Sequence, residues 1–160
     1  MKAEMPGPPP VSPCEAIRIV QSVYGLSSTA RSLPGEYDNN FEITMPDGRA
    51  FALKLMHPSR EPAFIDMQCR ALQHLELRTP LLVLPRIQPC KDGAAFTQVR
   101  LETGELRFVW MLSFLPGKVL AEVRPHPDEL LRSLGCLLGE MDRAFQSFSH
   151  PARCAACDGT

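Results

Sequence analysis

Several features that would place a protein in a simple class are missing from this sequence. No apolar run, such as residues 81–84, approaches the roughly 20 residues that a membrane-spanning helix needs. The 17 basic and 18 acidic side chains nearly cancel, which argues against a nucleic-acid arm or a polybasic membrane patch. The N-terminus is rich in proline and has no apolar core of a secretory signal. We therefore expect a cytoplasmic protein without nucleic-acid or membrane partners.

The motifs of several enzyme classes are also absent. The sequence contains no G-x-x-x-x-G-K-[ST] phosphate loop, no H-E-x-x-H zinc motif and no G-x-S-x-G nucleophile elbow. Its four histidines are scattered, and Cys154 and Cys157 lack the second cysteine pair that a zinc site usually needs. We therefore expect no metal site and interpret the six cysteines as reduced thiols.

The hydrophobic spacing predicts an ordered succession of helices and strands. Ser12 can cap a first helix, Glu15 completes a capping box, and Gly25 is its expected end. The further predicted elements are a strand hairpin over residues 40–56, a helix over about 62–77, strands over 82–87, 95–101 and 106–114, and a helix from near Pro127 to before His150. The order indicates an α+β fold with flanking helices and a mainly antiparallel sheet of five strands.

Lysine is scarce, with 4 lysines against 13 arginines, so a lysine inside an apolar strand calls for an explanation. Phe51-Ala52-Leu53-Lys54 has the form of the kinase strand motif V-A-I-K. The small Ala52 leaves room for a flat purine, and Lys54, on the same face, can reach α- and β-phosphate oxygens. An edge strand with a solvent-facing lysine would have the same pattern, so the neighbouring segments must decide.

The first such neighbour is the polar segment before the hairpin, Leu33-Pro34-Gly35-Glu36-Tyr37-Asp38-Asn39-Asn40-Phe41. Its backbone amides could cover phosphates, although a plain turn is the alternative. Together with Ala52-Leu53-Lys54-Leu55, this segment resembles the aminoglycoside phosphotransferase and choline kinase-like family, nearest to its hydroxylysine-kinase-like branch. The resemblance implies a protein-kinase-like N-lobe that binds ATP, with Gly35 and Asn39 in the loop over the nucleotide.

The second neighbour is the helix after the lysine, where the family resemblance implies an acidic residue that holds the lysine. The matching position here is Gln68, which shares the apolar face of the predicted helix with Phe64 and Leu75. Asp66 lies roughly 200° around the helix from Gln68. We therefore expect Gln68 to orient Lys54, with Asp66 as the second candidate.

The third neighbour is the apolar strand that ends at Leu115-Pro116-Gly117. The family has its hinge between lobes at this place. The resemblance implies that backbone groups of Ser113, Phe114 and Leu115 meet the adenine edge. A core strand that ends in a turn is compatible with this interpretation.

The resemblance extends over most of the chain but excludes the catalytic machinery. The composition predicts a disordered, proline-rich leader over 1–11 and an unpatterned tail over 151–160. The resemblance implies a nucleotide-binding N-lobe over 12–114 and a hinge and first helix toward the C-lobe over 115–150. Such kinases need an Asp in H-x-D-x-x-x-x-N and a later Asp that binds Mg²⁺. The near match at residues 126–133 has Ser where Asn belongs and opens an amphipathic helix. We therefore expect no catalytic residue in this chain.

Two functional hypotheses follow. The first is the ATP-binding lobe of a kinase that phosphorylates a hydroxyl of an amine-bearing metabolite, truncated before the C-lobe and inactive alone. The small-molecule acceptor and Mg²⁺ would then need the C-lobe. The second is a non-catalytic kinase-like interaction module, which would self-associate through the exposed surface that faces the C-lobe in the family.

Overall fold

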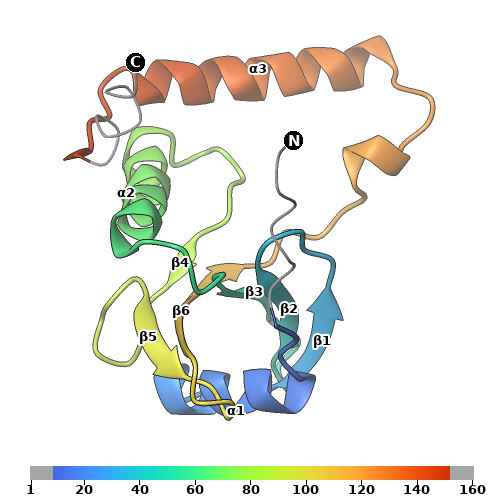
Figure 1. Cartoon of the computed structure of the whole chain (residues 1–160). Coiled ribbons are helices and arrows are strands. Elements are labelled where there is room, and N and C mark those ends of the chain that lie inside the picture. The colour runs from blue at the N-terminus through green and yellow to red at the C-terminus, as the bar shows by residue number, and fades with distance from the viewer. Residues whose placement is uncertain (1–8, 152–160) are drawn as a thin grey trace, which may run out of the picture. The chain divides into compact units, whose positions relative to one another are not determined.

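The computed structural model describes residues 9–151, which form two compact units (Figure 1). The first unit comprises the chain up to Asp66 together with Ile87–Phe114. The second comprises Met67–Arg86 and the chain from Leu115 onward. Most of the predicted leader and tail, including Cys154 and Cys157, lies outside the described residues.

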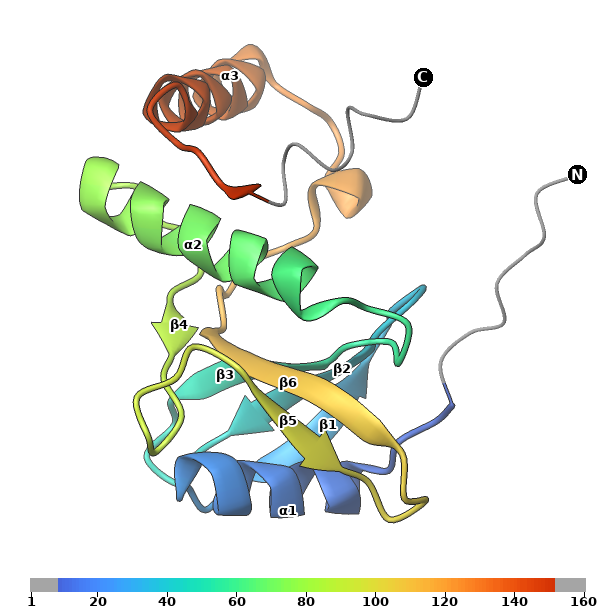
Figure 2. The same ribbon diagram turned by 60° about the vertical axis from the view of Figure 1, so that its left-hand side comes forward.

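A six-stranded antiparallel sheet forms most of the first unit (Figure 2). The strand order is β1-β2-β3-β6-β4, and β5 pairs with the same strand β6. The strands are β1 Thr29–Leu33, β2 Asn39–Thr44, β3 Ala50–Leu55, β4 Ile87–Gln88, β5 Thr97–Arg100 and β6 Leu106–Ser113. The predicted α+β class and antiparallel sheet are confirmed, with six strands in place of five.

Two stretches depart from the predicted strand pattern. β1 was not expected as a strand, because it lies at an edge of the sheet and none of its residues is buried. Of the predicted strand over residues 82–87, only Ile87 forms part of a strand, β4. Pro85 has no N–H to donate to a ladder, and the N–H of Leu82 is already bonded to the carbonyl of Thr79 in a turn.

The hairpin of β2 and β3 forms where the alternation predicted it. Gly48 has a φ of 85°, and its N–H donates to the carbonyl of Met45 at 3.0 Å, which closes the turn. Alternate residues of β3 are buried, and Leu53 lies on the buried face. Lys54 is on the opposite face, where the register pairs it with Asn40 of β2 and Trp110 of β6.

The helix α1, Pro13–Tyr24, covers one face of the sheet (Figure 2). The Ser12 Oγ accepts the N–H of Glu15 at 3.1 Å, and Gly25 ends the helix at a φ of 72°, as predicted. The predicted capping box is not completed, however. The Glu15 carboxylate instead accepts the N–H of Glu102 at 2.6 Å and so ties α1 to the β5–β6 turn. Val11, placed in the leader by sequence, is 8% exposed and belongs to this core.

Helices dominate the second unit. The helix α2, Pro62–Arg78, begins in the first unit, and α3, Asp128–Phe145, follows a 3-10 turn η1 at Leu120–Glu122. Within this unit, the His74 Nε2 lies 2.8 Å from the carbonyl of Ala144 near the end of α3, and its ring stacks on Phe145. In the part of the chain that the structure describes, none of the helices has the length and apolar character to span a bilayer.

Candidate functional site

The candidate nucleotide site is built around Lys54 on β3. Its ammonium donates to the Oδ1 of Asn40 at 3.1 Å, and Asn40 lies directly across from it on β2. Among the described residues, no carboxylate forms an ion pair with Lys54. The ammonium is therefore positioned by a neutral amide, which keeps its positive charge available for an anionic ligand.

Asn40 also fixes the polar loop that precedes β2. Its Nδ2 donates to the carbonyl of Pro34 at 3.2 Å and to that of Asp38 at 3.4 Å. Gly35 sits inside this arrangement, because a Cβ there would lie 2.3 Å from the Asp38 carbonyl and 2.4 Å from the Asn40 Nδ2. The loop can keep this conformation only with glycine at position 35. One side chain thus connects the loop backbone to the lysine.

Asp38 anchors the same loop to the segment after β3. Its Oδ1 accepts the backbone N–H of His57 at 2.8 Å and lies 3.9 Å from the Nε of Arg60. The loop is therefore held at both of its flanks, by Asn40 toward Lys54 and by Asp38 toward the β3–α2 connection. Holding a loop in advance lowers the ordering cost of any ligand that it covers.

Asn39, the other loop residue predicted for the nucleotide, faces away from Lys54. It pairs with Leu55 in the register, and its Oδ1 accepts from the Nη2 of Arg107 at 3.1 Å. Arg107 is 1% exposed, and its guanidinium also binds the carbonyl of Met56 and the carboxylate of Glu105. The side chain of Asn39 is thus part of a buried structural cluster, and any contact of Asn39 with a nucleotide would have to use its backbone.

The residues predicted to receive the purine are only partly assembled. Ala52 lies on the same face of β3 as Lys54 and is half-buried. Ser113 ends β6 opposite Phe51, and the N–H of Phe114 donates to the carbonyl of Ala50 at 3.1 Å. The N–H of Phe114 is therefore already used, which leaves its carbonyl for an adenine edge.

Three predicted residues lie at or beyond the boundary between the units. Asp66 is the last residue of the N-terminal part of the first unit, whereas Gln68 and Leu115 belong to the second unit. Among the described residues, the Gln68 Oε1 is buried without a hydrogen-bond partner. The pairing of Gln68 with Lys54 remains a prediction.

The described residues bring no three His, Cys, Asp or Glu side chains together in a way that could hold a metal ion. We therefore assign no Mg²⁺ ligands in this part of the chain. The features that fit a nucleotide are the lysine, the amide that orients it and the glycine-dependent loop.

Sequence reasoning missed Asn40, Asp38 and Arg107 as organisers of this region. Asn40 and Asp38 were visible as members of the polar segment, but only the strand register shows which of two adjacent asparagines faces Lys54. Arg107 follows a turn in a strand whose other residues are mostly apolar, and nothing local indicates that its guanidinium is buried.

Comparison with known proteins places this geometry in a family. The model of the phosphotransferase enzyme (APH) family matches residues 29–158, most of the chain. Hydroxylysine kinases of Danio rerio and Mus musculus are each 27% identical to the chain. Each alignment covers 89% of this chain and 41% of the relative, so the chain spans about two-fifths of the length of these relatives.

Solved kinases share the fold. A microcompartment-associated aminopropanol kinase matches with a TM-score of 0.67 at 17% identity, covering 86% of this chain and 42% of that one. An amicoumacin kinase in complex with AMP-PNP and Ca²⁺ matches with a TM-score of 0.72 at 14% identity, covering 88% and 42%. These likenesses confirm the kinase-like N-lobe fold. The chain belongs to the phosphotransferase enzyme (APH) family.

Proposed function

We propose that this chain is the ATP-binding lobe of a small-molecule kinase, in which Lys54 binds nucleotide phosphates under the loop of residues 34–40. The observation that carries the proposal is the hydrogen bond of 3.1 Å between the Lys54 ammonium and Asn40, whose amide also holds the loop. One side chain thereby contacts both the lysine and the backbone of the loop. This combination suits the α- and β-phosphates of a nucleotide.

The comparisons support this proposal without naming the ligand of this chain. The amicoumacin kinase of the same fold holds AMP-PNP and Ca²⁺. The curated relatives are hydroxylysine kinases, which suggests a hydroxyl of an amine-bearing metabolite as the acceptor. Gln68 would add a second hydrogen bond to Lys54, since its Oε1 lacks a donor among the described residues and an ammonium has three.

The direct test is titration of the chain with ATP, with and without Mg²⁺, followed by calorimetry or by amide shifts in an NMR spectrum. We expect weak binding, because pockets that hold small molecules well enclose roughly 70% or more of the ligand surface and a single lobe cannot do so. Lys54→Ala is expected to abolish the binding. Lys91→Ala is the matched control, since Lys91 is an exposed lysine that bonds to the carbonyl of Gln21.

Catalysis is tested separately. The sequence has no H-x-D-x-x-x-x-N motif, so we expect no release of ADP with hydroxylated amino acids or aminoglycosides in a coupled assay. Turnover that is lost on Lys54→Ala would contradict this expectation. Asp128 would then be the first residue to replace, because it stands in the near match to that motif.

The second candidate function is a non-catalytic interaction module that pairs with a second copy of itself. The observation in its favour is the exposure of large apolar side chains in the second unit, where Leu131 and Leu138 of α3 are 49% and 50% exposed and Leu81 is 95% exposed. Light scattering after size-exclusion chromatography, at several protein concentrations, measures this directly. A dimer whose stability is unchanged by ATP and by Lys54→Ala would favour the interaction module.

A further inference from the structure

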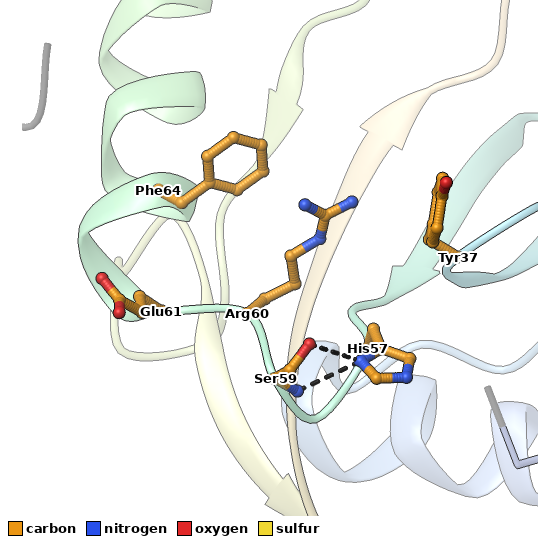
Figure 3. Close-up of a pocket in the computed structure, with 6 residues that line it drawn as sticks. All are labelled: Tyr37, His57, Ser59, Arg60, Glu61 and Phe64. Atoms are coloured by element: carbon orange, nitrogen blue, oxygen red, sulfur yellow. Dashed lines mark hydrogen bonds between the residues drawn. The ribbon is translucent and has the colours of Figure 1, made fainter. Parts of the chain in front are cut away.

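A pocket of about 500 Å³ opens between the loop of residues 34–40 and the connection from β3 to α2 (Figure 3). All of its lining residues belong to the first unit. They are Tyr37, His57, Ser59, Arg60, Glu61 and Phe64. The volume is in the range of roughly 300–1,000 Å³ that is typical of small-molecule sites, and Lys54 is not among the lining residues.

Two aromatic rings and a carboxylate surround the guanidinium of Arg60 in this pocket. The Cζ of its guanidinium lies 4.8 Å from the ring centroid of Phe64 and 5.7 Å from that of Tyr37. The Nε lies 3.9 Å from the Oδ1 of Asp38, which draws that edge of the guanidinium toward the loop. Two rings and a carboxylate therefore favour this orientation of the guanidinium, although its Nε is buried without a hydrogen-bond partner among the described residues.

The other edge of the guanidinium is not used by the protein. Within residues 9–151, the terminal nitrogens Nη1 and Nη2 of Arg60 make no hydrogen bond. Figure 3 shows them in the space between the rings of Phe64 and Tyr37. A fork of parallel N–H groups matches the two oxygens of a carboxylate or a phosphoryl group. The first turn of α2 begins two residues later at Pro62 and adds the positive end of a helix dipole.

The charges around the fork favour a singly charged ligand. The Nδ1 of His57 is engaged by Ser59, whose backbone N–H lies 3.2 Å and whose Oγ lies 2.7 Å from it. Arg60 is the one lysine or arginine among the lining residues, and two carboxylates, Asp38 beside the guanidinium and Glu61 at the rim, oppose a second negative charge.

We propose that this pocket binds the carboxylate of a small organic acid, which the Nη1 and Nη2 groups of Arg60 hold in a bidentate pair. The hydrocarbon part of the ligand lies against Tyr37 and Phe64. The site is distinct from the nucleotide contacts of Lys54, and it requires no nucleotide.

The test compares a carboxylate with its neutral isostere. The full chain, labelled with ¹⁵N, is titrated with isovalerate, isovaleramide and inorganic phosphate, and the amide signals of residues 57–64 and the Nε–H signal of Arg60 are followed. We expect saturable shifts with isovalerate. Isovaleramide should bind with an affinity at least about tenfold lower, because it cannot form hydrogen bonds between two charged groups.

Variants assign the effect to Arg60. Arg60→Gln is expected to weaken isovalerate binding at least about tenfold, and Arg60→Lys, which keeps the charge but not the fork, to weaken it by a smaller factor. Arg49→Gln is the matched control, because Arg49 is an exposed arginine whose Nε pairs with Asp47 at 2.7 Å in the β2–β3 turn.

Three results would overturn the proposal. They are equal binding of isovalerate and isovaleramide, unchanged binding by an Arg60→Gln variant whose spectrum remains that of the folded chain, and tighter binding of phosphate than of isovalerate at the same signals. The first and third comparisons use only the unaltered protein, so they stand even if a variant fails to fold. Loss of ATP binding on Lys54→Ala leaves this site unaffected, and the two proposals can therefore fail separately.

Discussion

The sheet-containing unit and the helical unit bury their apolar side chains to very different extents. In the first unit, Ile43, Leu53, Leu55, Val109 and Met111 are each 0% exposed and form one core with α1. In the second unit, the only buried residue of α3 is Ala144. Segments with few buried apolar contacts open most easily, so the sheet carries the stability of the described chain.

This difference shows what an amphipathic pattern does and does not predict. The stripe of Leu130, Leu134, Leu138, Met141 and Phe145 predicts the α3 helix correctly, but Leu138 of the predicted buried face is 50% exposed. Leu130, Leu134 and Met141 show how far the rest of the stripe is covered. All three are only half-buried, because a helical stripe specifies an apolar face but not the surface that covers it. By contrast, the apolar face that the alternation in β2 and β3 predicts is covered by α1 of the same chain.

The largest expected effect comes from making the same Leu→Ala substitution in each unit and comparing the two losses of stability. Leu53→Ala in β3 should lower the free energy of unfolding by about 2–5 kcal/mol, since it removes buried methyl groups and leaves a cavity. Leu138→Ala on the exposed side of α3 should change it by no more than about 0.5 kcal/mol. Urea unfolding followed by far-ultraviolet circular dichroism, which reports on both the sheet and the helices, measures both. Equal losses would mean that α3 is as well packed as the sheet.

The next effect concerns the buried arginine of the first unit. Arg107→Met should cost about 2–3 kcal/mol, because it leaves the carbonyl of Met56 and the Oδ1 of Asn39 without their donor. Arg100→Met is the matched control, since Arg100 is exposed and bonds to the carbonyl of Gly104 in the neighbouring turn. The same unfolding assay applies, and a loss of similar size for both variants would refute the special role of Arg107.

Glycine substitutions should have opposite signs in the two units. Gly35→Ala places a Cβ 2.3 Å from the carbonyl of Asp38, so the loop must move, at a cost of about 1–2 kcal/mol. A Cβ at Gly139 in α3 would meet nothing within 4 Å, and alanine there should stabilise the helix by up to about 1 kcal/mol. Hydrogen exchange of the loop and of α3 separates the two effects. A stabilised loop in Gly35→Ala would contradict the close approach seen in the structure.

Local chemistry made much of this fold predictable. Caps, turns and alternation placed α1, the β2–β3 hairpin and the β5–β6 hairpin, because each is specified by residues close together in sequence. The choice between Asn39 and Asn40 depended on a register that neighbouring residues do not specify uniquely. Likewise Glu15 had a local partner available in the capping box but bonds to Glu102, which is far away in sequence.

The sequence predicts the position of the lysine in the candidate site but not the residues that surround it. Lys54 and Ala52 followed from a strand motif whose spacing of two puts both on one face. The pocket around Arg60 could not be found in this way, since Tyr37 and Asp38 belong to the loop of residues 34–40, which lies far in sequence from the segment of Arg60 and Phe64. Long-range convergence of this kind leaves no periodic signal in the sequence.

The smallest expected effect is a difference in reactivity between a buried thiol of the first unit and an exposed thiol of the second. Burial raises the pKa of the Cys90 thiol above its ordinary 9.0, and the hydrogen bond from Tyr24 offsets this only in part. Cys136 on α3 is exposed. At pH 8, alkylation by iodoacetamide should therefore modify Cys136 before Cys90, as peptide mass spectrometry can show.

The raised pKa of Cys90 also fixes the sign of a pH effect on stability. The unfolded chain ionises this thiol near pH 9.0, whereas the folded chain keeps it protonated to higher pH. The stabilising contribution of the neutral thiol is thus fully present below pH 9 and is lost as the pH rises toward the folded pKa. The difference in unfolding free energy between the wild type and Cys90→Ala should therefore begin to shrink as the pH rises past 9.0. A difference between the two that stays constant over this rise would show that Cys90 is not shielded from water, and that the core of the sheet-containing unit is less closed than the static structure indicates.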